Sequence, residues 1–232
     1  MENLKDFMKF IYKIILLFII LVSVTSYYFF NKNRLMKSTV IILNGPSASG
    51  KSSIQEAFIR KSESPWIKIG IDNFFVGVLS NYYIFGEYKP QNPNYKIIEG
   101  IASEDELKNP IFTLKIGPAG EKIIEGMNHA IKSYADAGNN IIVDYIAYNP
   151  VWLENLVKLL KDHKVIVVSV TLPLEILEQR EASRATSPRG HARSHYETVH
   201  KHNIPYNLNV DTSKVIAEEA AESISKLVGK LN

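Results

Sequence analysis

One short stretch decides the fold of this chain: Ile41-Ile42-Leu43-Asn44-Gly45-Pro46-Ser47-Ala48-Ser49-Gly50-Lys51-Ser52. Its apolar first part is typical of a buried β-strand, and its second part has the G-x-x-x-x-G-K-S spacing of a phosphate-binding loop. Residues 53–60 then carry apolar side chains at helical spacing, so we expect the loop to open a helix whose N-terminus attracts anions. A serine- and glycine-rich turn with a chance lysine is the alternative, but the flanking strand and helix favour a nucleoside triphosphate site.

The loop is expected to surround phosphate oxygens with backbone N–H groups, because Gly45 and Gly50 permit conformations that a Cβ atom forbids. Lys51 would add positive charge at the β- and γ-phosphates, and the Ser52 hydroxyl would contact Mg²⁺. ATP and Mg²⁺ are therefore the predicted ligands. The predicted nucleotide-binding residues are Gly45, Pro46, Ser47, Ala48, Ser49, Gly50, Lys51, Ser52 and Ser53.

Length and composition limit the class of protein. The chain has 232 residues, of which 46% are hydrophobic, which is enough for the core of one domain. A net charge of +3 is too small to indicate a nucleic-acid partner. The absence of cysteine excludes a disulfide framework, a thiolate metal site and a cysteine nucleophile. Four histidines, at 191, 195, 200 and 202, lack the partners and spacing of a familiar metal site, and the oligomeric state is left open.

The N-terminal segment differs from the rest of the chain. The 17 residues from Ile14 to Phe30 carry no charge, and as a helix they would span ~26 Å, near the lower limit for a bilayer. We expect residues 1–37 to form a hydrophobic helix and linker that anchor a cytoplasmic domain, residues 38–232, in a membrane through residues 14–30. The alternatives are a signal peptide, or an upstream extension if translation starts at Met36, which would leave a cytoplasmic protein.

Strands and helices alternate along the remaining chain. The expected strands after the first are residues 66–71, 140–144, 164–170 and 207–210, and the expected helices include 118–137, 150–161, 174–184 and one from about residue 211. This alternation predicts an α/β fold with three layers, in which helices cover both faces of a five-stranded parallel sheet. Residues 81–110, with several Tyr, Pro and Asn, are expected to be irregular.

Two aspartates are expected to meet the phosphate loop. Asp72 and Asp144 follow the second and third strands, and the carboxyl ends of parallel strands form one ligand-binding edge. Asp72 is the predicted general base for a substrate hydroxyl, with a helix N-cap as the alternative. Asp144, together with Ser52, is predicted to hold Mg²⁺, and a strand-end acid that makes only turn contacts is the alternative.

Arginines gather after the fourth strand, at positions 180, 184, 189 and 193. Arg180 and Arg184 share a helix face, and the segment that follows them is typical of a loop that closes over phosphates. Arg180, Arg184 and Arg189 are predicted, with Lys51 and Asp72, to be catalytic residues that stabilise the transferred phosphoryl group. Solvated surface charges are the alternative interpretation.

In their order, these segments resemble the chloramphenicol phosphotransferases. The resemblance covers residues 38–228 and is carried by residues 39–53, 65–72, 137–144, 180–184 and 206–212. It implies a P-loop kinase fold and an ATP-dependent transfer of phosphate to a hydroxyl of a small molecule. Asn73 and Tyr145 depart from the family pattern, and residues 81–110 have little likeness to the family's acceptor region. Chloramphenicol, a sugar and a nucleoside are all open as acceptors.

Other functions are open as well. A membrane-tethered module that binds nucleotide without turnover would share the phosphate loop, and so would a kinase for another metabolite, a nucleic-acid end or a cell-wall precursor. A GTPase is less expected, because the chain has no N-K-x-D guanine signature. Asp72 beside Lys51 and Ser52 favours an enzyme that turns over, since a non-catalytic module needs no carboxylate there.

Overall fold

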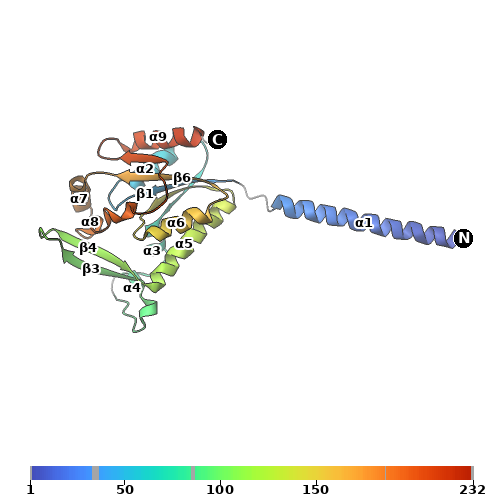
Figure 1. The fold of residues 1–232 in the computed structure, drawn as a ribbon, viewed down its shortest axis with the longest axis horizontal. Helices are drawn as coiled ribbons and strands as arrows, with labels where there is room; N and C mark the ends of the chain where they lie inside the picture. The colour runs from blue at the N-terminus through green and yellow to red at the C-terminus, as the bar shows by residue number, and fades with distance from the viewer. Residues whose placement is uncertain (1, 33–36, 85–86, 186, 231–232) are drawn as a thin grey trace. The chain divides into compact units, whose positions relative to one another are not determined.

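A computed structural model describes residues 2–32, 37–84, 87–185 and 187–230. Contacts within the chain divide it into two units, Met1–Met36 and Lys37–Asn232. The described part of the first unit is one helix, α1 (Glu2–Lys32), and all the other elements belong to the second unit (Figure 1).

Helix α1 confirms the expected N-terminal helix but not the expected membrane anchor. Within the described residues, no helix combines the length and the apolar character that a membrane crossing requires. Membrane contact through residues 14–30 is therefore not supported. Met36, the alternative start, lies outside the described residues.

The second unit contains the expected parallel sheet. Its five strands are β1 (Thr39–Asn44), β2 (Trp66–Gly70), β5 (Asn140–Tyr145), β6 (Lys164–Thr171) and β7 (Leu208–Asp211). They lie in the order β2-β5-β1-β6-β7, and every neighbouring pair is parallel. The prediction of an α/β fold with a five-stranded parallel sheet is confirmed.

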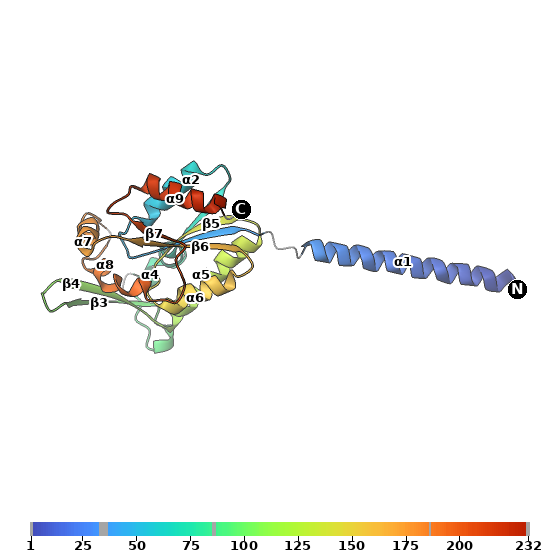
Figure 2. The ribbon, with the colours of Figure 1, turned by 45° about the horizontal axis from the view of Figure 1, so that its top comes forward.

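Helices cover both faces of the sheet, which gives three layers (Figures 1 and 2). One face packs against α2 (Lys51–Lys61) and α9 (Ala217–Lys230), and the other packs against α3 (Ile71–Phe75), α5 (Pro118–Asp136) and α6 (Pro150–Leu159). Along β1, Val40 and Ile42 face the second group of helices, whereas Ile41 and Leu43 face the first. All four side chains are fully buried, which explains why this strand is apolar without alternation.

The sequence suggested that residues 81–110 are irregular throughout, but the structure contains regular elements there. They include α4 (Asn81–Ile84), a 3-10 turn η1 (Pro93–Tyr95) and β3 (Ile98–Glu104), which pairs antiparallel with β4 (Pro110–Ile116). This two-stranded hairpin is separate from the main sheet. Most side chains of β3 are exposed, so no apolar run marked the strand. The Phe112 N–H donates to the Gly190 carbonyl at 3.1 Å and fastens β4 to the loop before α8 (His191–His195).

The C-terminal part differs from expectation in one boundary. After α7 (Leu174–Ala182), α8 and the 3-10 turn η2 (Thr198–His200), the last helix begins at Ala217 rather than near residue 211. Asp211 Oδ1 accepts hydrogen bonds from the Ser213 N–H at 3.0 Å and the Ser213 hydroxyl at 2.6 Å. These cap-like side chains therefore close a turn ahead of the helix.

Candidate active site

The loop between β1 and α2 is shaped by close backbone contacts. Ala48 and Gly50 have left-handed backbone angles, with φ of 63° and 95°. Gly45 is required for a different reason, because a Cβ atom there would lie 2.2 Å from the Val170 carbonyl oxygen of β6. Residues 45–52, the phosphate loop, are thus pressed against the sheet edge where β1 and β6 end.

Lys51 lies at the centre of the phosphate loop and is only 3% exposed. Its Nζ donates to the carbonyls of Gly45 at 2.9 Å and Pro46 at 2.7 Å, and it lies 3.4 Å from Asp144 Oδ1. Burial lowers the pKa of Lys51, and the nearby Asp144 carboxylate opposes that shift. The ammonium group is therefore held by the loop and by the end of β5 together.

Ser52 and Asp144 offer oxygen ligands side by side. The Ser52 hydroxyl donates to Asp144 Oδ2 at 2.7 Å. Among the described residues no cluster of three or more His, Cys, Asp or Glu could hold a metal ion. This pair fits Mg²⁺, because Mg²⁺ prefers oxygen ligands and is usually held by one or two protein groups together with substrate phosphates.

Ser49 provides a second test of whether the loop fits a phosphate group. Its hydroxyl is the buried side-chain oxygen that finds no hydrogen-bond partner within the described part of the chain. It lies inside the loop, 3.2 Å from the position that a Cβ of residue 45 would take. Buried hydroxyls are normally hydrogen-bonded, so a phosphate oxygen would supply the missing acceptor.

Asp72 lies at the start of α3, but it is not the cap of that helix. The N-cap residue is Gly70, and the Gly70 N–H donates to Asn73 Oδ1 at 2.6 Å. Partial removal from water, followed by the charge of Asp144, raises the pKa of the Asp72 carboxyl, whereas Lys51 lowers it. A carboxylate with a raised pKa is a stronger base than an ordinary aspartate.

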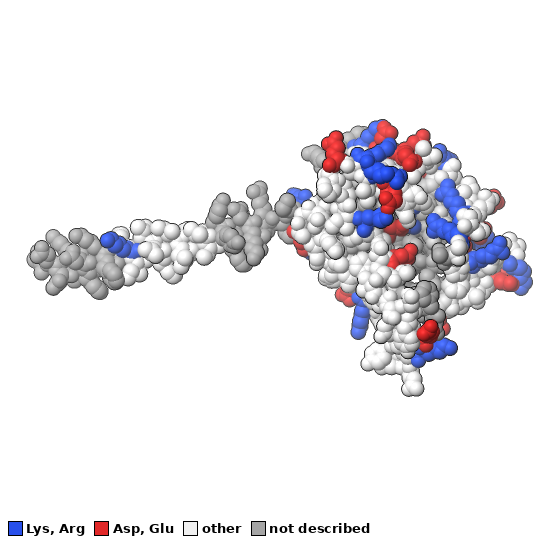
Figure 3. All heavy atoms as spheres, turned by 180° about the vertical axis from the view of Figure 1, so that it is seen from behind, with Lys and Arg blue, Asp and Glu red and all other residues white. Residues whose placement is uncertain are grey.

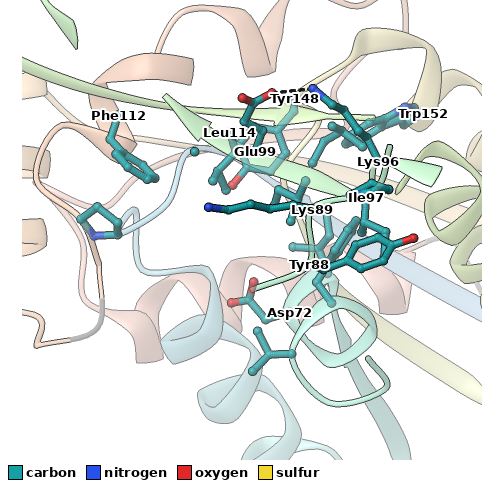
Figure 4. A pocket seen from close by; sticks show the side chains of 18 residues that line it. Asp72, Tyr88, Lys89, Lys96, Ile97, Glu99, Phe112, Leu114, Tyr148 and Trp152 are labelled. Atoms are coloured by element: carbon teal, nitrogen blue, oxygen red, sulfur yellow. Dashed lines mark ion pairs between the residues drawn. The ribbon is translucent and has the colours of Figure 1, made fainter. Parts of the chain in front are cut away.

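Asp72 borders two hollows. The first, the phosphate-loop hollow, has a volume of about 210 Å³ and is lined by the phosphate loop, Asp144 and Arg184. The second, which we call the hairpin pocket, has a volume of about 660 Å³ and lies between α3 and the β3–β4 hairpin (Figure 4). Ile71 and Asp72 line both.

The three arginines predicted to form one lid have different surroundings. Arg180 donates to the Thr212 hydroxyl at 2.9 Å and to its carbonyl at 2.8 Å, and the Thr212 hydroxyl donates to the Ser49 carbonyl at 2.9 Å. Arg184 lines the phosphate-loop hollow, and Arg180 and Arg184 both line a neighbouring hollow of about 420 Å³ beside Thr212. Arg189 is exposed and lines neither of these two hollows. The structure thus brings Arg184, but not Arg189, to the phosphate loop.

Two histidines that sequence reasoning considered only as metal ligands take part in the site. His195 Nε2 accepts a hydrogen bond from the Ser47 N–H of the phosphate loop at 3.0 Å. His191 Nε2 lies 3.0 Å from the hydroxyl of Tyr148, which lines the hairpin pocket. Burial lowers the pKa of both histidines, to about 2 for His195, so both are neutral near pH 7. The spacing of four residues, which places both on one side of a helix, was the available signal.

Two solved kinases have a similar fold. A sugar kinase from Janibacter sp. HTCC2649 matches with a TM-score of 0.53 and 16% identity, over 83% of this chain and 95% of that chain. The Mycobacterium tuberculosis APS kinase, in complex with AMPPNP and APS, matches with a TM-score of 0.53 and 18% identity, over 83% of this chain and 98% of that chain. At these identities the likeness concerns the fold.

Sequence comparison identifies the family. A protein of Mycobacterium tuberculosis (strain H37Rv) named "Putative O-phosphotransferase Rv2636" is 26% identical over 185 residues, which cover 80% of each chain. The family model described as "Chloramphenicol phosphotransferase-like protein" matches residues 38–229. The match spans the whole parallel sheet, the phosphate loop and both hollows beside Asp72. This chain belongs to the chloramphenicol phosphotransferase-like family.

Proposed function

We propose that this chain is an ATP-dependent phosphotransferase that phosphorylates a hydroxyl group of a small molecule. The observation that carries the proposal is the position of Asp72, whose carboxylate borders both the phosphate-loop hollow and the hairpin pocket. A hydroxyl that enters from the hairpin pocket would meet a base and a γ-phosphate at the same point. Membership of the phosphotransferase family supports the same reaction class.

The phosphate loop would bind the triphosphate of ATP. The loop follows β1 and leads into α2, and its backbone N–H groups lie at the N-terminus of that helix, which favours anions. Lys51 Nζ, now on the carbonyls of Gly45 and Pro46, is within the loop and would turn to the β- and γ-phosphates. The unpaired Ser49 hydroxyl would donate to a phosphate oxygen.

Ser52 and Asp144 would hold the metal ion of the nucleotide complex, directly or through water. When bound, Mg²⁺ would neutralise charge on the β- and γ-phosphates. The hydrogen bond between Ser52 Oγ and Asp144 Oδ2 keeps both groups at the mouth of the loop. Arg184, which lines the same hollow, would add positive charge around the transferred group.

Asp72 would act as the general base. The acceptor oxygen attacks the γ-phosphorus, the bond to the β,γ-bridging oxygen breaks, ADP leaves, and the acceptor proton passes to the Asp72 carboxylate. Arg180 has a supporting place in this scheme, because its hydrogen bonds go to Thr212, which in turn donates to the Ser49 carbonyl of the phosphate loop. Arg189 lines neither hollow beside the loop, so we assign it no contact with the reacting groups.

The Asp72→Asn variant tests this proposal. We expect its affinity for ATP to stay near that of the wild type and its kcat to fall by roughly 10²-fold or more, the usual scale for loss of a general base. The measurement is ADP release by the full chain with a panel of hydroxylated acceptors, beside calorimetric binding of ATP. Glu99→Gln is the matched control, since Glu99 lines the hairpin pocket but not the phosphate-loop hollow.

Two results would contradict the assigned roles. An equal loss of ATP affinity and rate in Asp72→Asn would make Asp72 a structural residue. ATP binding without acceptor-stimulated ADP release across the panel would favour a nucleotide-binding module over an enzyme.

A further inference from the structure

The hairpin pocket is chemically unlike a site for a sugar or another small polar metabolite. Its wall is mostly aromatic and aliphatic, with side chains that include Phe75, Tyr88, Phe112, Leu114 and Trp152. A volume of about 660 Å³ falls in the range of pockets that take drug-sized molecules. A sugar ring would turn several hydroxyl groups toward this wall, and each buried hydroxyl without a partner costs free energy. The pocket therefore favours an acceptor with a large apolar body.

Only four of the residues that line this pocket are charged: Asp72, Lys89, Lys96 and Glu99. Lys96 and Glu99 form an ion pair, with Lys96 Nζ 3.5 Å from Glu99 Oε2 (Figure 4). Asp72 is the proposed base. The remaining charge is the Lys89 ammonium, for which the described part of the chain shows neither an ion pair nor a hydrogen bond.

Lys89 is exposed, and unlike several other lysines at the surface it has no acidic partner among the described residues. Lys132 pairs with Asp136, Lys214 with Asp211 and Lys226 with Glu222. Figure 3 shows acidic and basic side chains interspersed on one face of the molecule. In contrast, Figure 4 shows the Lys89 side chain extended into the hairpin pocket.

The place of Lys89 also separates it from the phosphate machinery. Lys51 and Arg184 line the phosphate-loop hollow, whereas Lys89 lines only the hairpin pocket. Its charge is thus placed for the acceptor rather than for the nucleotide. Lys89 is exposed in this pocket. A neutral apolar acceptor would leave its ammonium to water, while an anionic group bound along the same wall would pair with it.

We propose that the acceptor is an amphipathic hydroxy acid, with an apolar body on the hairpin wall, a hydroxyl at Asp72 and an anionic group at Lys89. The inference rests on the proposed function, because it takes the hairpin pocket as the acceptor site. The inference narrows the acceptor class further than family membership does, because it requires the acceptor to carry a negative charge. Lys89 is a specificity-determining residue in this arrangement and takes no part in the chemical step.

A matched pair of probes tests the inference: the carboxylate and the primary amide of one hydroxymethyl-biphenyl, which share the apolar body and the alcohol. Binding to the full chain is measured by calorimetry in the presence of AMPPNP, so that no turnover is needed. We expect the wild type to bind the carboxylate about threefold more tightly than the amide, the scale of an exposed ion pair. Lys89→Met should remove that preference, and Lys89→Arg should retain most of it.

The double variant Lys96→Met/Glu99→Gln is the matched control, because the two residues line the same pocket and their charges already compensate each other. It should keep the preference for the carboxylate. The inference fails if the wild type binds both probes alike, if it binds neither, or if Lys89→Met weakens both to the same degree.

Failure of the proposed function would look different from failure of this inference. A preference for the carboxylate that depends on Lys89, with no ADP release from ATP and either probe, would overturn the proposed phosphotransferase and leave the assignment of the pocket's ligand supported. ADP release that is faster with the amide than with the carboxylate would support the phosphotransferase and overturn the hydroxy-acid acceptor.

Discussion

The phosphate-loop hollow and the hairpin pocket share Ile71 and Asp72, but they are built in opposite ways. The phosphate-loop hollow is formed by backbone groups, a buried lysine and a carboxylate, all at the edge of the central sheet. The hairpin pocket is formed by side chains, many of which belong to two strands that pair only with each other. The phosphate-loop hollow is thus part of the central sheet and its core, whereas the hairpin pocket is built largely on a separate hairpin attached to that core.

This difference suggests a division of labour within the proposed enzyme. A triphosphate presents the same shape and charge in every turnover, which a rigid loop pressed against the sheet can match. An acceptor pocket on an attached hairpin can change its lining without disturbing the sheet. Substitutions in the loop should therefore affect stability and nucleotide binding, whereas substitutions in the hairpin region should affect only the acceptor.

Gly45→Ala should have the largest effect, because it forces the phosphate loop away from the sheet. The new methyl group would lie 2.2 Å from the Val170 carbonyl oxygen, which is backbone and cannot turn aside. We expect a loss of about 2–3 kcal/mol in the free energy of unfolding, the upper range for overpacking, and loss of ATP binding. Denaturant unfolding and calorimetry measure the two effects.

Gly126→Ala is the control for that substitution. Gly126 lies inside α5, where a Cβ atom would meet nothing within 4 Å. Alanine there should stabilise the protein by roughly 0.5–1 kcal/mol, because glycine is a poor helix former. A Gly45→Ala protein as stable as the wild type would show that the loop and β6 are not so closely apposed.

The pH dependence of turnover should identify Asp72, the titratable residue shared by the two hollows. Burial and the charge of Asp144 raise the pKa of Asp72 above its ordinary 3.8. Because the proposed base must be unprotonated, kcat should fall about tenfold for each pH unit below that raised pKa. This acid limb should be present in Glu99→Gln and absent from the residual activity of Asp72→Asn. A midpoint at or below 3.8 would contradict the role of Asp72.

His195 should influence nucleotide binding through its contact with the phosphate loop. Its neutral Nε2 accepts the Ser47 N–H, so His195→Leu leaves a loop amide without its acceptor. We expect about tenfold weaker ATP binding by calorimetry for His195→Leu, and binding close to wild type for His195→Gln, whose side-chain oxygen can accept the same hydrogen bond. Equal losses in the two variants would indicate that His195 acts through packing alone.

The parts of the molecule that could be predicted from sequence are those with local signals. The phosphate loop is one continuous motif, and β1 and β6 are unbroken apolar runs because both faces of the sheet are covered. Asp72 and Asp144 could be placed at one edge because parallel strands share a carboxyl end. The resemblance added the order of these segments, and the family match confirms it.

The parts that sequence reasoning missed depend on contacts between distant segments. The hydrogen bond from the Ser47 N–H to His195 joins residues 148 positions apart, and no local sequence pattern predicts it. The exposed strand β3 lacks an alternation of apolar and polar residues, so its pairing with β4 left no signature. For the N-terminal helix the sequence predicted a feature that is not found. Its apolar run suggested a membrane span, but no helix among the described residues is long and apolar enough to make one.

Arg193 offers the smallest and most selective test of the attached hairpin. Its guanidinium donates to Glu178 of α7 at 2.5 Å and to Asp105, in the turn between β3 and β4, at 3.0 Å, so it ties the hairpin to the helix that carries Arg180. These groups are partly exposed, so the contribution of the pair to stability should be small, about 0.2–1 kcal/mol. Arg193→Gln should raise KM for the acceptor about threefold, because the hairpin wall loses one of its fastenings, and should leave the affinity for ATP unchanged.

Lys108→Gln is the control in the same turn, since the pair of Lys108 with Glu104 is highly exposed, and it should change neither quantity. Weaker ATP binding in Arg193→Gln would show that the hairpin and the phosphate loop are coupled, and the division between a fixed nucleotide site and an attached acceptor site would have to be abandoned.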